Sequence, residues 1–101
     1  AKIERMNLAE DRFKVIAVTS AVPAEGKSVN SVNLARALSI DPTGKTLLID
    51  CDLRKPSVHR FFRLTREGGM SDALLTGKLS SSYIKSVAPG LDVITAGTPV
   101  V

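Results

Sequence analysis

Hydrophobic and polar positions along the chain follow two spacings, one typical of buried strands and one typical of helices. Residues 14–19 (KVIAVT) form a continuous run rich in β-branched side chains, as in a strand buried on both faces of a parallel sheet. From residue 26 to about residue 40, apolar positions such as Val29 and Val32 recur at helical spacing. Residues 46–50 (TLLID) form a second buried-strand run. This order predicts a βαβ unit, whose crossover is almost always right-handed.

The second half of the chain predicts shorter elements. Residues 56–62 have apolar side chains at i, i+3 and i+4, and Pro56 suits the first position of a helix. Residues 71–76 predict another short helix, closed by the glycine that follows it. A weaker helical turn is expected over residues 81–87, and residues 91–95 (LDVIT) predict a third strand.

These elements predict an α/β fold in which a parallel sheet is flanked by helices. A doubly wound sheet usually has more than three strands, so we expect residues 1–101 to be a single, partial domain. Within it, residues 14–101 are expected to form the α/β core, and residues 1–13 an N-terminal helix or linker.

The amino-acid composition excludes several classes of protein. Of the 101 residues, 44% are hydrophobic and 24% are charged, which is typical of a folded domain and excludes a disordered or low-complexity chain. No apolar run approaches the roughly 20 residues of a membrane helix, and residues 1–10 lack the apolar stretch of a secretion signal. The single cysteine, Cys51, cannot form an internal disulfide, which suits a reducing cytoplasm.

The net charge of +4 originates in one segment. Residues 54–66 contain five basic residues and no acidic one: Arg54, Lys55, Arg60, Arg63 and Arg66. A solvated helix face and a surface for phosphates or an acidic partner both fit this pattern, and charge alone does not choose between them.

The sharpest chemical signal lies between the first predicted strand and the helix. Residues 21–28 (AVPAEGKS) fit the phosphate-binding pattern G-x-x-x-x-G-K-[ST], except that Ala21 replaces the first glycine. The backbone N–H groups of such a loop and of the helix start converge on an anion. Lys27 would add a positive charge for the β and γ phosphates, and the hydroxyl of Ser28 is suited to ligate Mg²⁺.

A pair of carboxylates follows the second predicted strand. Asp50 and Asp52 are two residues apart, which places both on one side of an extended chain. The carboxyl end of that strand belongs to the sheet edge that binds ligands in open α/β folds. Two carboxylates beside a triphosphate would repel it unless a cation lies between them, so Mg²⁺ is the economical explanation. The alternative is that Asp50 caps the following turn and Asp52 is solvated.

The two motifs SAVPAEGKS and LLIDCDLRKP, with residues 33–35 on the intervening helix, resemble the bacterial tyrosine kinases of capsule and exopolysaccharide synthesis. That family lies within the ParA and MinD group of P-loop ATPases, and the resemblance runs from about residue 14 to residue 99. It implies that Lys27 holds the phosphates of ATP, that Ser28 and Asp52 hold Mg²⁺, and that Asp50 activates a tyrosine hydroxyl. The residues expected to bind the nucleotide are Ala24, Glu25, Gly26, Lys27, Ser28, Val29 and Arg54.

Departures from the family pattern refine this interpretation. The family usually has glycine at the position of Ala24, and Val22 replaces the signature lysine of the partition ATPases, which favours the kinase branch. Lys2 and Arg5 are expected to be remnants of the E-x-x-R-x-x-R helix that drives ring assembly. The family's Walker B strand and tyrosine-rich tail are expected beyond Val101.

Two further side chains carry structural expectations. Tyr83, the only tyrosine of the chain, is interpreted as a half-buried helix residue and not as a phosphorylation site. Cys51, between the two aspartates, is expected to be a packed thiol.

The resemblance therefore implies the ATP-binding part of an autophosphorylating protein-tyrosine kinase that regulates capsular or exopolysaccharide synthesis and export. Expected ligands and partners are ATP or ADP, Mg²⁺, protein tyrosine substrates, a membrane-embedded activator of the polysaccharide co-polymerase type and further copies of the protein, with no nucleic acid. The expected location is the cytoplasm, at the inner face of the membrane. Two alternatives stay open: a ParA or MinD type positioning ATPase, and a non-catalytic nucleotide-sensing regulator of polysaccharide export.

Overall fold

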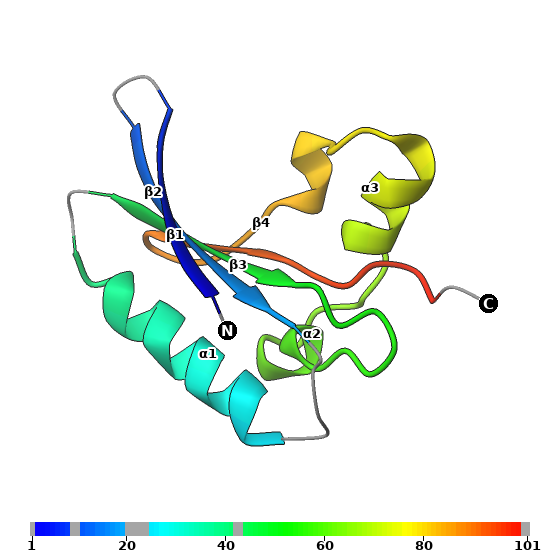
Figure 1. Cartoon of the computed structure of the whole chain (residues 1–101), viewed down its shortest axis with the longest axis horizontal. Coiled ribbons are helices and arrows are strands. Elements are labelled where there is room, and N and C mark those ends of the chain that lie inside the picture. The colour runs from blue at the N-terminus through cyan, green and yellow to red at the C-terminus, as the bar shows by residue number, and fades with distance from the viewer. Residues whose placement is uncertain (1, 9–10, 20–24, 42–43, 100–101) are drawn as a thin grey trace.

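Figure 1 shows the chain as a computed structural model that describes residues 2–8, 11–19, 25–41 and 44–99, with the backbone alone for residues 2–8, 11–13 and 25–28. Within these residues lies a five-stranded sheet of order β1-β2-β3-β5-β4. Its strands are β1 (Lys2–Leu8), β2 (Asp11–Val18), β3 (Lys45–Asp50), β4 (Lys85–Ala88) and β5 (Leu91–Ile94). The predicted α/β class is confirmed, and the three predicted strands form the parallel centre of the sheet, β2, β3 and β5.

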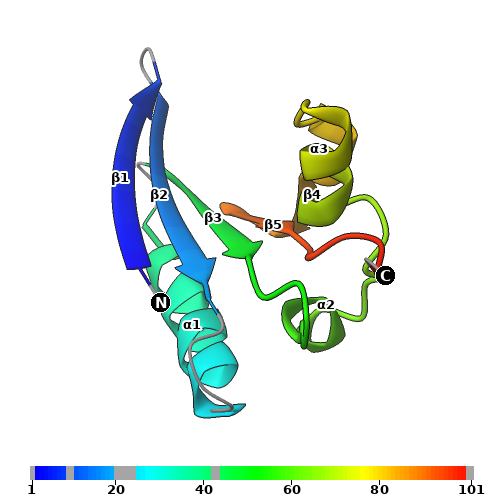
Figure 2. The same cartoon turned by 45° about the vertical axis from the view of Figure 1, so that its right-hand side comes forward.

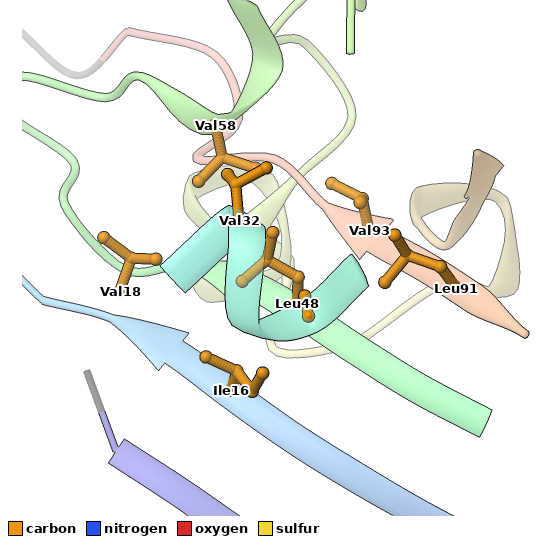
Figure 3. Close-up of a cluster of buried hydrophobic side chains, with 8 residues drawn as sticks. Ile16, Val18, Val32, Leu48, Val58, Leu91 and Val93 are labelled. Atoms are coloured by element: carbon orange, nitrogen blue, oxygen red, sulfur yellow. The ribbon is translucent and has the colours of Figure 1, made fainter. Parts of the chain in front are cut away.

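The predicted βαβ unit is confirmed. Helix α1 (Glu25–Leu38) leads from β2 to β3, and these strands pair in parallel, with Ile16 beside Leu48. Both side chains are fully buried in one hydrophobic cluster that also contains Val32 of α1 and Val58 (Figure 3). The strands read as apolar runs because helices cover the sheet, which leaves little polar surface along its centre.

The helices lie on both sides of the sheet. Helix α2 (Val58–Phe61) shares the buried cluster with α1 and therefore covers the same face. Helix α3 (Met70–Thr76) lies on the other side of the sheet from α1 in both views (Figures 1 and 2). The end of α3 is confirmed, since Gly77 follows it with a left-handed φ of 73°.

The N-terminal residues do not form the expected helix or linker. Residues 2–8 form β1, which pairs antiparallel with β2, so that Arg5 lies beside Lys14. The prediction for residues 1–13 is therefore wrong over the described positions, and so is the placement of Lys2 and Arg5 on an assembly helix. In the structure the backbone N–H and C=O groups of residues 2–8 are paired with those of β2 and not with one another within a helix.

Two boundaries in the second half also differ from prediction. Helix α2 begins at Val58, with Ser57 before it, and the buried Pro56 precedes the helix. Residues 81–87 do not form one helical turn, because a short 3₁₀ helix (Ser81–Tyr83) is followed by β4. Strand β4 pairs antiparallel with β5. This pairing supplies partners for backbone N–H and C=O groups of β5, which a helical turn in its place would not supply.

Over the part of the chain that the structure describes, no helix has the length and apolar character needed to cross a membrane.

Candidate functional site

The carboxyl ends of β2, β3 and β5 meet at one edge of the sheet, because the three strands are parallel (Figure 1). Helix α1 begins at Glu25, so Gly26, Lys27 and Ser28 form its first turn, as predicted. Residues 20–24 of the phosphate-binding pattern, with Ala24 among them, lie outside the described residues, and the side chains of residues 25–28 are not described. Of the remaining candidates, Val29 on α1 and Arg54 after β3 are both exposed.

Asp50 lies at the end of β3, and its side chain is completely buried. Its Oδ1 accepts the backbone N–H of Asp52 at 3.0 Å, and its Oδ2 accepts the backbone N–H groups of Ser57 and Val58, each at 3.1 Å. The carboxylate thereby closes residues 51–57, the carboxylate loop, onto the end of β3 and the start of α2. This agrees with the alternative interpretation that Asp50 caps the turn after the strand.

The protonation of Asp50 is set by opposing effects. Burial raises the pKa of Asp50, while the N–H donors of Val58, Asp52 and Ser57 act to lower it, and the charge of Asp52 adds to the increase. The net direction is upward, because loss of hydration penalises the ionised form most.

Asp52 has different surroundings. It is partly exposed, and its Oδ1 accepts the backbone N–H of Lys55 at 3.1 Å. The other oxygen of this carboxylate has no donor among the residues that the structure describes. Of the two aspartates, Asp52 therefore has the oxygen that an incoming cation can reach.

Cys51, between the aspartates, is exposed, so the prediction of a packed thiol is wrong. The alternation of more and less buried side chains along β3 continues past the buried Asp50, so Cys51 falls on the less buried side. Burial nevertheless raises the pKa of the Cys51 thiol, and the charge of Asp50 adds to that effect.

The donor set suits magnesium. Mg²⁺ is usually bound by one or two carboxylates together with waters and substrate phosphates, and seldom by a cage of protein groups. Among the described residues, no cluster of three or more His, Cys, Asp or Glu side chains is arranged to hold a metal. One reachable carboxylate, Asp52, and one hydroxyl, Ser28, at the start of α1 are the kind of ligands that Mg²⁺ and a nucleotide require.

Sequence reasoning missed the contacts of Arg66. Its Nε donates to the carbonyl oxygen of Gly97 at 2.7 Å, and its Nη2 donates to the carbonyl oxygen of Leu53 at 3.4 Å. Arg66 was only one member of the basic run, whose other members, Arg54, Lys55, Arg60 and Arg63, are exposed. Backbone carbonyls as partners leave no signal in the sequence, so no pattern distinguished Arg66 from the rest.

Tyr83 lies at the end of the 3₁₀ helix and is partly buried. The prediction of a half-buried helical residue is therefore confirmed.

A parallel βαβ unit with a phosphate-loop sequence at the helix start and two carboxylates after the next strand is the arrangement of a P-loop nucleotide-binding domain. No family model matches the chain. The chain is 40% identical over 87 residues to the tyrosine-protein kinase YwqD of Bacillus subtilis, covering 85% of this chain and 36% of YwqD. It is 41% identical over 69 residues to the succinoglycan biosynthesis transport protein ExoP of Rhizobium meliloti, covering 67% of this chain and 8% of ExoP.

A solved structure is also similar to this chain. The kinase domain of VpsO matches with a TM-score of 0.67 and 40% identity, covering 85% of this chain and 42% of that domain's chain. By sequence and fold, the chain is homologous to proteins named bacterial tyrosine-protein kinases, and it spans less than half the length of these relatives. These relatives favour a kinase over both a positioning ATPase and a non-catalytic regulator.

Proposed function

We propose that the chain is the ATP-binding part of a bacterial protein-tyrosine kinase that phosphorylates itself and other proteins on tyrosine. The supporting observation is the pair of carboxylates at the end of β3, one buried and one reachable, beside the strand that leads to Gly26, Lys27 and Ser28. This set neutralises and orients a metal-bound triphosphate, which is most of what phosphoryl transfer requires of a protein.

Each proposed residue has a task. Lys27 and the first N–H groups of α1 bind the phosphates, Ser28 and Asp52 hold Mg²⁺, and the other loop residues and Arg54 border the nucleotide. When bound, Mg²⁺ neutralises charge on the phosphates and orients them for an in-line attack. ATP supplies the phosphoryl group.

Asp50 acts by holding the carboxylate loop. To accept the proton of a tyrosine hydroxyl, as the family resemblance implies, Asp50 would need an oxygen that the hydroxyl can reach. In this conformation both of its oxygens accept backbone N–H groups, and the side chain has no exposed surface. Proton acceptance by Asp50 thus requires that one of these oxygens first becomes accessible to the hydroxyl.

The same proposal includes the biological process, the partners and the location of the protein. ExoP is named as a polysaccharide biosynthesis transport protein, which supports a role in capsular or exopolysaccharide synthesis and export. The proposed partners are a membrane-embedded activator of the co-polymerase type, protein tyrosine substrates and further copies of the protein, at the cytoplasmic face of the membrane.

Nucleotide binding can be measured as thermal stabilisation. Mg-ATP at about 100 times its dissociation constant should stabilise the fold by about 2.7 kcal/mol, which raises the Tm by several degrees. The substitution Lys27→Ala should abolish the shift. Lys45→Ala is the matched control, because Lys45 is exposed at the opposite end of β3. A wild-type chain without a shift, or an equal shift in Lys27→Ala, would contradict the proposal.

Transfer to tyrosine needs a separate measurement. The full-length protein, incubated with Mg-ATP, should acquire phosphotyrosine, and its Lys27→Ala variant should not. ATP binding without any phosphotyrosine would instead favour the nucleotide-sensing regulator.

A further inference from the structure

Two segments far apart in sequence are joined beside the candidate site. Residues 66–72 precede and begin α3, and residues 95–98, which we call the exit segment, follow β5. The backbone N–H of Met70 donates to Thr95 O, and that of Ser71 to Ala96 O, each at 2.8 Å. The hydroxyl of Ser71 donates to Thr98 O at 2.6 Å. These bonds make the exit segment a fixed support at the carboxyl edge of the sheet.

The same support leaves no room for additional atoms. A methyl group on Gly69 would overlap the carbonyl oxygen and hydroxyl of Thr95, and one on Gly97 would overlap the hydroxyl of Ser71. All three of Gly69, Ser71 and Gly97 are buried. Close packing of backbone against backbone resists displacement, so groups anchored here have defined positions.

Arg66 connects this support to the carboxylate loop. Its own carbonyl oxygen accepts the hydroxyl of Thr95 at 2.7 Å, and its Nε donates to Gly97 O, so both its backbone and its side chain are anchored. The Nη2 of the same guanidinium reaches Leu53 O at 3.4 Å, and Leu53 directly follows Asp52. One side chain thus bridges the fixed support and the loop that carries the reachable carboxylate.

We propose that Arg66 is a positioning residue: its guanidinium holds the carboxylate loop against the exit segment and so sets the place of Asp52. The consequence for nucleotide binding rests on the proposed function. The effect on the loop itself does not, because it follows from contacts among protein groups alone.

The chemistry requires an arginine. A guanidinium presents several N–H donors in a rigid plane, so it reaches two carbonyl oxygens from two directions at once. A lysine ammonium has the same charge but lacks the planar fork, and it is expected to keep one of the two contacts. Glutamine at this position retains neither the charge nor the reach.

The test compares Arg66→Gln and Arg66→Lys with wild type by amide hydrogen exchange of the 101-residue chain. In Arg66→Gln, the amides of Asp52, Ser57 and Val58 should exchange roughly tenfold faster, the factor expected when a bond from a charged donor is lost. The amide of Val32 in α1 should exchange as in wild type. Arg66→Lys should fall between the two.

Arg63→Gln is the matched control, since it removes the same charge from an exposed member of the basic run. It should leave exchange in the loop unchanged. Unchanged loop exchange in Arg66→Gln would overturn the proposal, and so would equal acceleration of every amide in the chain, including that of Val32.

A second readout links the loop to the ligand. Mg-ATP should bind more weakly to Arg66→Gln than to wild type, while ATP without Mg²⁺ should bind both alike, because the change reaches the nucleotide through Asp52. Equal weakening with and without Mg²⁺ would contradict the role through Asp52. Absence of Mg-ATP binding by the wild-type chain would contradict the proposed function and leave the exchange result as evidence on the loop.

Discussion

The carboxylate of Asp72 accepts the backbone N–H of Thr98 at 3.0 Å, across 26 residues of sequence. The same oxygen accepts the N–H groups of Gly68 and Gly69, each at 2.9 Å. These donors, with Gly69 contributing most and the hydroxyl of Thr98 next, lower the pKa of Asp72 to about 2. Asp72 thus connects the start of α3 to the exit segment as a charged hydrogen-bond acceptor.

Acid should weaken the fold through Asp72. Its pKa is about 2 in the folded chain, compared with 3.8 for an ordinary aspartate, so the unfolded chain takes up the proton first as the pH falls. The stabilisation is therefore complete above about pH 5 and is lost progressively toward pH 2. In Asp72→Asn, the free energy of unfolding should be lower at pH 6 and should change less between pH 4 and pH 2. Urea denaturation at a series of pH values measures both.

Glu67→Gln serves as the comparison for Asp72→Asn. Glu67 is an exposed acid close to Asp72 in sequence, and its substitution should leave the acid-side slope as in wild type. A slope that survives in Asp72→Asn would assign the acid sensitivity to another carboxylate.

The centre of the sheet was predictable because burial on both faces imposes an unusual composition. The runs around Ile16, Leu48 and Val93 contain few polar side chains, and each is a parallel strand in the structure. The edges were not predictable in this way. Strands β1 and β4 are identified by their partners, since they complete the hydrogen bonding of β2 and β5.

The candidate site likewise contains residues that the sequence predicts and residues that it does not. The residue types and spacing of Lys27, Asp50 and Asp52 predict phosphate and metal chemistry, because that chemistry needs particular functional groups. Arg66 and Asp72 act on backbone N–H and C=O groups, which every residue has, so nothing in the sequence indicates which ones they reach. Only the folded chain shows that both residues bind backbone groups of the exit segment.

The close packing of the exit segment can be tested with two glycines. Gly97 and Gly77 both have positive φ values, of 91° and 73°. A methyl group at Gly77 meets no atom within 4 Å, whereas one at Gly97 would overlap the Ser71 hydroxyl and lie 2.7 Å from the backbone nitrogen of Ser71. Gly77→Ala should therefore cost about 1–2 kcal/mol, for the left-handed backbone alone.

Gly97→Ala should add about 1–3 kcal/mol to that cost, because atoms are forced into an occupied space. Chemical denaturation of the two variants gives the difference directly. Equal losses of stability would show that the contact between the exit segment and Ser71 yields without strain.

Cys51 provides a probe of the carboxylate loop. The thiol is exposed, but burial and the charge of Asp50 raise its pKa above the ordinary value of 9.0. Since the thiolate is the reactive form, alkylation at pH 7 should be slower than for a free cysteine peptide. The rate should continue to rise with pH beyond the point where the peptide levels off. Following the single thiol by mass spectrometry from pH 7 to pH 10 measures this, and a rate equal to that of the peptide would contradict the raised pKa.

The two aspartates should separate stability from binding. In Asp50→Asn, an amide NH₂ replaces an oxygen that accepts backbone N–H groups, so buried donors lose their acceptor. The expected loss is about 1–3 kcal/mol in the free energy of unfolding. Asp52→Asn alters a partly exposed side chain and should change stability by no more than about 0.5 kcal/mol.

For Mg²⁺-dependent ATP binding, we expect Asp52→Asn to have the larger effect and Asp50→Asn the smaller. Asp52→Asn removes the charge that we assign to Mg²⁺ and should abolish the Mg²⁺ dependence of ATP binding, measured by calorimetry with and without the metal. Asp50→Asn, studied at a temperature where it is fully folded, should retain that dependence with reduced affinity, because its loop is less well held. If Asp50→Asn were as stable as wild type but lost all Mg²⁺ dependence, Asp50 would be the metal ligand and the roles assigned to the two carboxylates would be exchanged.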